Sequence, residues 1–280
     1  MVKYLHRLFA LGRAIILGSI TGFIFIACNQ THPLDALPAG ETGRVVRIIN
    51  GGGLILDTGL KVRLVGLEAP RPAYSDQAAQ PYADISKREL ENRVLGRRVQ
   101  IFYPGLTRDK YDRALAHIRL LDGPPDHAWV NLDMIKAGHA RARLYPDTSR
   151  LGEVLLIAER EARQSKQGLW QWPVYAVQNA ASLKADIRGF YLLQGKSSAP
   201  LALKASPYSC EWQFQEAEID IKILESAGDI CGWLKEDMDV ILRGYLNNGQ
   251  VVINHPAHIE RVAPAPITAS KAAAASGAPL

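Results

Sequence analysis

The chain has 280 residues, with 33 Lys and Arg against 28 Asp and Glu and a formal net charge of +5. Three of the basic residues fall within residues 1–28, so residues 29–280 carry a net charge of only +2. The overall charge therefore does not indicate which kind of partner the protein binds. The charge is unevenly distributed. Residues 29–184 hold 22 basic and 17 acidic side chains, whereas residues 185–264 hold 7 and 11. Any anion-binding surface is therefore expected on the first part of the chain.

The N-terminus has the layout of an export signal. Basic residues precede an apolar run over residues 14–27, and no acidic residue comes before Asp35. This pattern predicts a signal peptide over residues 1–28, because the run is short for a spanning helix. The run ends at Cys28, which resembles the lipidated cysteine of a bacterial lipobox; an uncleaved anchor or ordinary cleavage nearby is the alternative. We expect an exported protein on the periplasmic side of a bacterial membrane, lipid-anchored at Cys28.

The remaining cysteines form an even pair. With Cys28 assigned to lipidation, Cys210 and Cys231 are left, and an oxidising compartment favours a disulfide between them over two buried free thiols. No Cys/His spacing typical of zinc occurs.

Short apolar alternations separated by turn residues predict a β-rich first unit. An amphipathic segment opened by Pro81 and stopped by Gly96 predicts a helix after the third strand. Five strands with a helix in this place predict an OB-type five-stranded barrel with extra helices, in the α+β class. The expected strands are 43–49, 53–57, 60–67, 98–103 and 114–121, and the expected helices are 81–95, 130–137 and 151–164.

A second unit over residues 186–263 again alternates apolar and polar residues, and we expect a second small β-barrel, OB-like, with a hairpin around Asn248. Residues 29–42 and 173–185 are predicted linkers. Residues 264–280 are rich in Ala, Pro and Ser and are predicted to form a disordered tail.

Residues 43–172 resemble the staphylococcal nuclease (thermonuclease) family. The second unit, which ends in HPAHIERV, is similar to a small β domain attached to some exported bacterial members. After the strand meander, the motifs that carry the family resemblance follow in a consistent order: VRLVGLEAP, DKYDRALAHIRL, VNLDMIKAGHA, AEREAR and GLW.

The resemblance implies a phosphodiester site. Hydrolysis needs positive charge on the phosphoryl oxygens, a positioned water and usually a metal. The arginines that the family uses to stabilise this charge match Arg63 and Arg113, and its ligand-binding tyrosines match Tyr111 and Tyr145.

The calcium ligands and the general base implied by the resemblance are largely missing. Asn50 and Gly52 stand where the family has acids, which leaves Glu68 as a weak metal ligand. Arg71 occupies the position of the general base, and a guanidinium cannot accept a proton. Asp76 and Asp112 are the nearest substitutes by sequence. Four scattered histidines are expected to be packing or surface residues: His117, His139, His255 and His258.

Two functions remain open. The first is a catalytically degenerate binding or scaffold module, with no cofactor, which takes nucleic acid, another anionic ligand or an unknown protein partner on residues 43–172. The second is an active nuclease with an altered calcium site. The arginines also have a purely structural reading, as Arg63–Glu68 and Arg113–Asp112 ion pairs.

Overall fold

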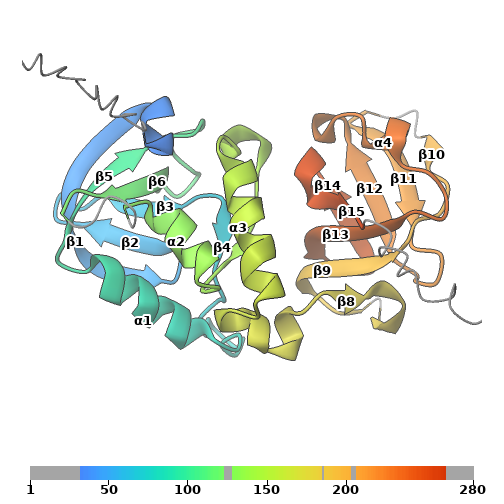
Figure 1. The fold of residues 1–280 in the computed structure, drawn as a ribbon, viewed down its shortest axis with the longest axis horizontal. Coiled ribbons are helices and arrows are strands. Elements are labelled where there is room, and N and C mark those ends of the chain that lie inside the picture. The colour runs from blue at the N-terminus through green and yellow to red at the C-terminus, as the bar shows by residue number, and fades with distance from the viewer. Residues whose placement is uncertain (1–31, 123–127, 185, 203–205, 263–280) are drawn as a thin grey trace, which may run out of the picture. The chain divides into compact units, whose positions relative to one another are not determined.

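The computed structural model describes residues 32–122, 128–184, 186–202 and 206–262. Five strands of its N-terminal part close into a barrel in the order β1-β2-β3-β6-β5, which confirms the predicted barrel (Figure 1). The strands are β1 (Ala39–Asn50), β2 (Gly53–Leu56), β3 (Lys61–Leu64), β5 (Arg98–Phe102) and β6 (Ala114–Leu120).

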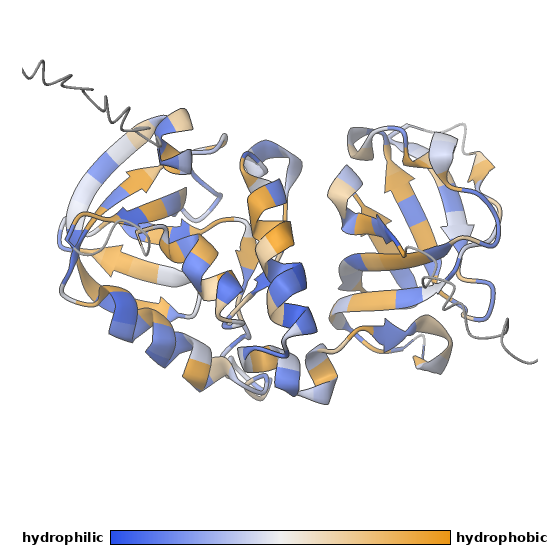
Figure 2. Ribbon diagram, in the orientation of Figure 1, coloured by the Kyte–Doolittle hydropathy of each residue, from blue (hydrophilic) through white to orange (hydrophobic). Residues whose placement is uncertain are grey.

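Three helices and a short ribbon complete this domain. Helix α1 turns Leu90 and Val94 into the core and ends at Val94, two residues before Gly96, whose φ of 73° suits glycine. Hydrophilic residues cover most of the rest of α1 (Figure 2). The ribbon pairs Leu67 with Ala142 and Glu68 with Arg141. The bounds are α1 Ala83–Val94, α2 Val130–Lys136, α3 Gly152–Gln164, β4 Leu67–Glu68 and β7 Arg141–Ala142.

The chain joins the barrel earlier than predicted. A 3-10 turn spans Pro33–Ala36 and β1 begins at Ala39, so the described part of the linker expected over residues 29–42 belongs to the barrel domain. The reason is burial: Leu34 and Leu37 are 0% and 5% exposed and pack in the barrel core.

The second domain is β, as predicted, and its strands form two four-stranded sheets with the orders β10-β11-β12-β14 and β15-β13-β9-β8. Residues of both sheets form one hydrophobic core, which includes Trp212. The strands are β8 (Gln178–Asn179), β9 (Gly189–Lys196), β10 (Leu201–Ala202), β11 (Tyr208–Gln213), β12 (Asp220–Leu224), β13 (Asp239–Leu246), β14 (Gln250–Ile253) and β15 (Ile259–Arg261); the short helix α4 spans Ile230–Trp233.

The segment predicted as a second linker, residues 173–185, is part of the fold over its described residues, 173–184. Tyr175 and Ala180 are buried, and Gln178–Asn179 adds β8 beside β9. An aromatic side chain that packs in the core makes this stretch part of the domain rather than a spacer.

The turn predicted around Asn248 is present, but the two strands that it connects, β13 and β14, do not pair with each other beyond it. Asn248 and Gly249 both have positive φ, as a tight turn requires, and Asn247 pairs with Gln250. Beyond that bridge β13 pairs with β9 and β15, whereas β14 pairs with β12 in parallel. The turn therefore carries the chain from one sheet to the other.

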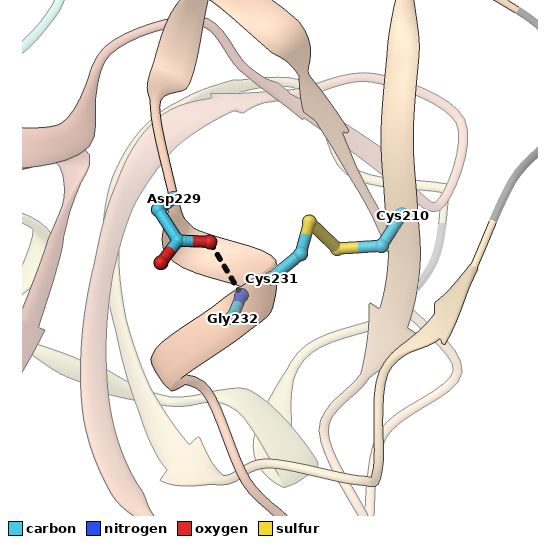
Figure 3. The surroundings of a disulfide bond; sticks show 4 residues. All are labelled: Cys210, Asp229, Cys231 and Gly232. Carbon is cyan, nitrogen blue, oxygen red and sulfur yellow. Dashed lines mark hydrogen bonds between the residues drawn. A yellow bond between two sulfur atoms is a disulfide. The ribbon is translucent and has the colours of Figure 1, made fainter.

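Cys210 on β11 and Cys231 on α4 form a disulfide, with their Cα atoms 6.1 Å apart (Figure 3). Asp229 accepts a hydrogen bond from the N–H of Gly232 at 3.1 Å and so caps the same helix. The disulfide ties the four-residue helix α4, which is too short to be stable alone, to the sheet.

Replacing Cys210 and Cys231 together with serine is expected to lower the free energy of unfolding by about 3 kcal/mol, because the disulfide closes a loop with a sequence separation of 21. Urea unfolding of the purified protein measures the change. Dithiothreitol should destabilise the parent by a similar amount and leave the double variant unchanged. A difference below about 1 kcal/mol would contradict the expectation.

The predicted signal peptide, the lipidated Cys28 and the tail over residues 264–280 lie outside the described residues. Within the described ranges, no helix has both the length and the apolar character needed to cross a membrane.

Candidate functional site

A cavity of about 240 Å³ opens where β3, the β1–β2 turn and the segment after β4 meet. Val62 and Leu64 turn into the barrel core, so the alternation of β3 places Arg63 on the other side. We call this the arginine cavity. It is lined by Ile49, Asn50, Gly52, Gly53, Val62, Arg63, Leu64, Leu67, Glu68, Ala69, Arg71 and Arg113.

Arg113 is held in place by Asp109. Its Nε and Nη2 atoms lie 2.8 and 2.6 Å from Asp109 Oδ2, while Oδ1 accepts hydrogen bonds from the N–H groups of Tyr111 and Arg113. Burial raises the pKa of Asp109, but the hydrogen bonds from Arg113 and these N–H groups outweigh it and hold the pKa below its usual value. The Arg113–Asp112 pair considered from the sequence is not formed: Asp112 faces Arg108 at 3.7 Å.

Glu68 is paired with two arginines. Its Oε2 atom lies 3.0 Å from Arg143 Nη1 and 3.9 Å from Arg63 Nη2. The Arg63–Glu68 pair is therefore present but long, and Arg143 is the nearer partner. The sequence analysis missed Arg143, although it stands two residues before Tyr145, directly after β7.

The β1–β2 turn uses its polar group internally. Asn50 Oδ1 accepts a hydrogen bond from the N–H of Gly52 at 2.9 Å. Gly51 is fixed by packing, because a Cβ there would lie 1.9 Å from Ser86 Oγ on α1. These two contacts keep the turn tight although it contains no acidic residue.

These oxygens do not fit a calcium ion. Calcium takes about six to eight oxygen ligands, several of them carboxylates. Here Glu68 already faces Arg143, and Asn50 Oδ1 is engaged within its own turn. In the described ranges, no group of three or more His, Cys, Asp or Glu is arranged to hold a metal.

Neither substitute acid reaches the arginine cavity. Among the described residues that line it, Glu68 is the only carboxylate. Asp76 is exposed in the loop after Arg71, and the Asp112 side chain is 95% exposed. The four histidines do not line this cavity, and His117 and His258 are buried.

A second cavity of about 450 Å³ shares Arg63 and Arg113 with the first and contains both predicted tyrosines. Tyr111 is 64% exposed, with the Arg113 guanidinium 5.4 Å from its ring centre. Arg143 lies 5.1 Å from the ring centre of Tyr145. We call this the tyrosine cavity. Tyr111 is exposed and Tyr145 is half-buried, and aromatic rings at a cavity surface can stack on a planar group.

The charge of the two cavities is strongly positive. Arg63 and Arg113 line both cavities. Arg143 lines the tyrosine cavity and pairs with Glu68, and Arg71 lines the arginine cavity. The N–H of Arg71 donates to Gln80 Oε1 at 2.8 Å, which fixes the backbone and leaves the guanidinium exposed. The arrangement suits an anion rather than a cation.

Comparison with known protein families gives a match within the first domain of the chain. The family model described as "Staphylococcal nuclease homologue" matches residues 61–172. An uncharacterized endonuclease of Escherichia coli O157:H7 is 33% identical over 131 residues, which cover 46% of this chain and 76% of that protein. The chain belongs to the staphylococcal nuclease family.

Other members of the staphylococcal nuclease family are similar at lower identity. A thermonuclease of Staphylococcus intermedius is 29% identical over 166 residues, covering 57% of this chain and 96% of that protein. A thermonuclease of Staphylococcus hyicus is 28% identical over 137 residues, covering 46% of this chain and 76% of that protein. The family match includes Arg63, Glu68, Arg71, Arg113 and Arg143. The second domain lies beyond it.

Proposed function

We propose that this chain binds nucleic acid through the staphylococcal nuclease site without hydrolysing it. One observation carries the proposal: the family's site holds Arg71 beside Arg63 and Arg113, and Glu68 is the only carboxylate among the described residues that line it. A site with this charge recognises a phosphodiester and repels the metal that would activate water.

The two cavities divide the binding between them. Arg113, preorganised by Asp109, and Arg63 would donate to the oxygens of one phosphate, and a bidentate arginine fits this geometry. Tyr111 and Tyr145 would stack on the adjoining base in the tyrosine cavity. Stacking requires an unpaired base, so single-stranded nucleic acid is the proposed ligand class.

Several features argue against hydrolysis. Glu68 lies 3.0 Å from Arg143, so the carboxylate of this cavity is engaged in an ion pair. Arg71 stands where the family resemblance places the base, and it accepts no proton. We therefore propose that neither calcium nor another metal cofactor takes part.

Replacing Arg71 with alanine is expected to weaken binding of a fluorescent single-stranded oligonucleotide by about 10-fold or more, because it removes one charged contact to phosphate. The slope of log affinity against log salt should fall by about one. Fluorescence anisotropy over a salt series measures both. Arg98→Ala is the matched control, since Arg98 is an exposed arginine on β5 outside both cavities.

A digestion assay separates binding from hydrolysis. The purified protein with calcium should leave single-stranded DNA intact. Calcium-dependent cleavage that Arg113→Ala abolishes would refute the non-hydrolytic proposal and support an active nuclease. Binding with no salt dependence would refute the phosphate contact.

We also propose that the protein is exported and held at a membrane through Cys28. The sequence pattern of residues 1–28 supports this, and a Cys210–Cys231 disulfide is typical of exported proteins. Metabolic labelling with a fatty acid in a bacterial host tests it: Cys28→Ser should remove the label.

A further inference from the structure

Arg141 on β7 is a buried arginine without an ion pair. It is 3% exposed, and no carboxylate of the described residues lies within 4 Å of its guanidinium. Its Nη1 atom donates to the carbonyl oxygen of Phe190 at 2.6 Å, and its Nε atom has no partner. The guanidinium lies 5.0 and 4.7 Å from the ring centres of Tyr175 and Phe190.

Such a group needs a counter-charge. Burial lowers the pKa of Arg141, but a guanidinium stays protonated in proteins, so the positive charge persists. The nearest acids are committed elsewhere. Glu68 faces Arg143 at 3.0 Å, and Glu159 faces Arg243 at 2.6 Å. A buried charge left in this state is strongly destabilising.

A small cavity of about 70 Å³ adjoins Arg141, and a second arginine lines it. The Nε and Nη2 atoms of Arg188 lie 3.2 and 2.8 Å from Asn248 Oδ1, a neutral acceptor that leaves the charge of Arg188 uncompensated. The described lining contains no carboxylate and consists of Gln80, Pro81, Arg141, Val174, Tyr175, Arg188, Gly189, Phe190 and Tyr191.

We propose that this cavity binds one small inorganic anion, of chloride to phosphate size, between Arg141 and Arg188. The space exceeds what a single water needs, about 10–15 Å³ by the same measure, and is too small for an organic ligand. An anion supplies the missing counter-charge and an acceptor for Arg141 Nε, whereas water supplies only the acceptor.

The site is separate from the nucleic-acid site. Its lining shares no residue with the arginine cavity or the tyrosine cavity. The cavity is lined by Arg141, which lies on β7 beyond the barrel strands, and by Arg188, which directly precedes β9. A bound anion therefore stabilises the contact between these two segments. A ligand that binds only the folded state raises its stability by mass action.

Thermal unfolding at constant ionic strength tests the proposal. Replacing potassium gluconate, which is too large for the cavity, with chloride or inorganic phosphate should raise Tm by about 5 °C once the anion is well above its Kd. The arm with the larger shift identifies the preferred anion. Arg188→Gln should remove most of the shift while the protein still folds, because Arg188 is exposed. Arg98→Gln, an exposed arginine on β5, should retain it.

Crystals grown in bromide provide the direct reading. An anomalous peak in the cavity next to Arg141 Nε is expected in the parent protein and should disappear in Arg188→Gln. A Tm that is equal in gluconate, chloride and phosphate, or a shift that Arg188→Gln keeps in full, would overturn the assignment and leave only water in the cavity.

Discussion

Replacing Glu159 with alanine is expected to lower the free energy of unfolding by about 3–5 kcal/mol, the range for removing one partner of a buried ion pair. Glu159 on α3 is fully buried, and its Oε2 atom lies 2.6 Å from Arg243 Nη1. Its Oε1 atom accepts a hydrogen bond from the N–H of Ala142 at 2.7 Å. The alanine variant leaves Arg243 with Glu260 as its remaining acidic partner and leaves a buried N–H without an acceptor.

Urea unfolding of the parent and the variant measures the difference. Glu153→Ala, an exposed position on the same helix, is the matched control and should change stability by less than about 0.5 kcal/mol. Glu159→Gln should fall between the two, because its amide oxygen still accepts from Ala142. A loss below about 1 kcal/mol for Glu159→Ala would show that Arg243 finds another partner.

The same cluster explains how the two β domains are joined. Arg243 lies on β13, Glu260 lies on β15, and Arg163 of α3 contacts Glu260 at 3.2 Å. Burial opposes the charge of Arg243, but Glu159 and Glu260 outweigh it, so the pKa of Arg243 lies above its usual value. The domains have opposite net charge, yet the most buried pair joins an acid of the basic domain to an arginine of the acidic one. Specific burial, not net charge, sets the contact.

The barrel was predictable because its signals are local. Alternating apolar residues and glycine turns place strands β1 to β3, and the helix expected over residues 81–95 is Ala83–Val94 in the structure. Proline at the start and Gly96 at the end limit that helix whatever it packs against. The motif order then identified the family.

The missed features depend on contacts distant in sequence. Leu34 and Leu37 look like linker residues until the barrel core is placed beside them. Arg143 becomes a site residue only because β7 pairs with β4 and brings it to Glu68. The choice of Asp109 over Asp112 as the partner of Arg113 depends on the fold of one loop, in which Asp112 has a φ of 57°. Spacing in the sequence does not contain this information.

Acidification from pH 7 to pH 5 is expected to lower the free energy of unfolding by about 4 kcal/mol, through two buried histidines. Burial lowers the pKa of His117 from 6.5 to about 4 and that of His258 from 6.5 to about 3. Between pH 6.5 and these values the unfolded chain binds protons that the folded protein does not. Stability is therefore fully present above pH 6.5 and falls as the pH decreases, by about 2 kcal/mol for each histidine at pH 5.

The stability that the two histidines contribute is lost over a different pH range from the stability that the acids contribute. Asp109 and Glu260 also have lowered pKa values, but their contribution is lost only as the pH falls below their ordinary values of 3.8 and 4.5. Urea unfolding at pH 7, 6 and 5 thus reports mainly on histidine. His117→Gln and His258→Gln should each remove about 2 kcal/mol of the pH dependence. Burial also lowers the pKa values of His139 and His255, and these two histidines supply the part that remains in the double variant. If the double variant loses stability between pH 7 and pH 5 as steeply as the parent does, the acid sensitivity arises elsewhere, because glutamine takes up no proton in this range.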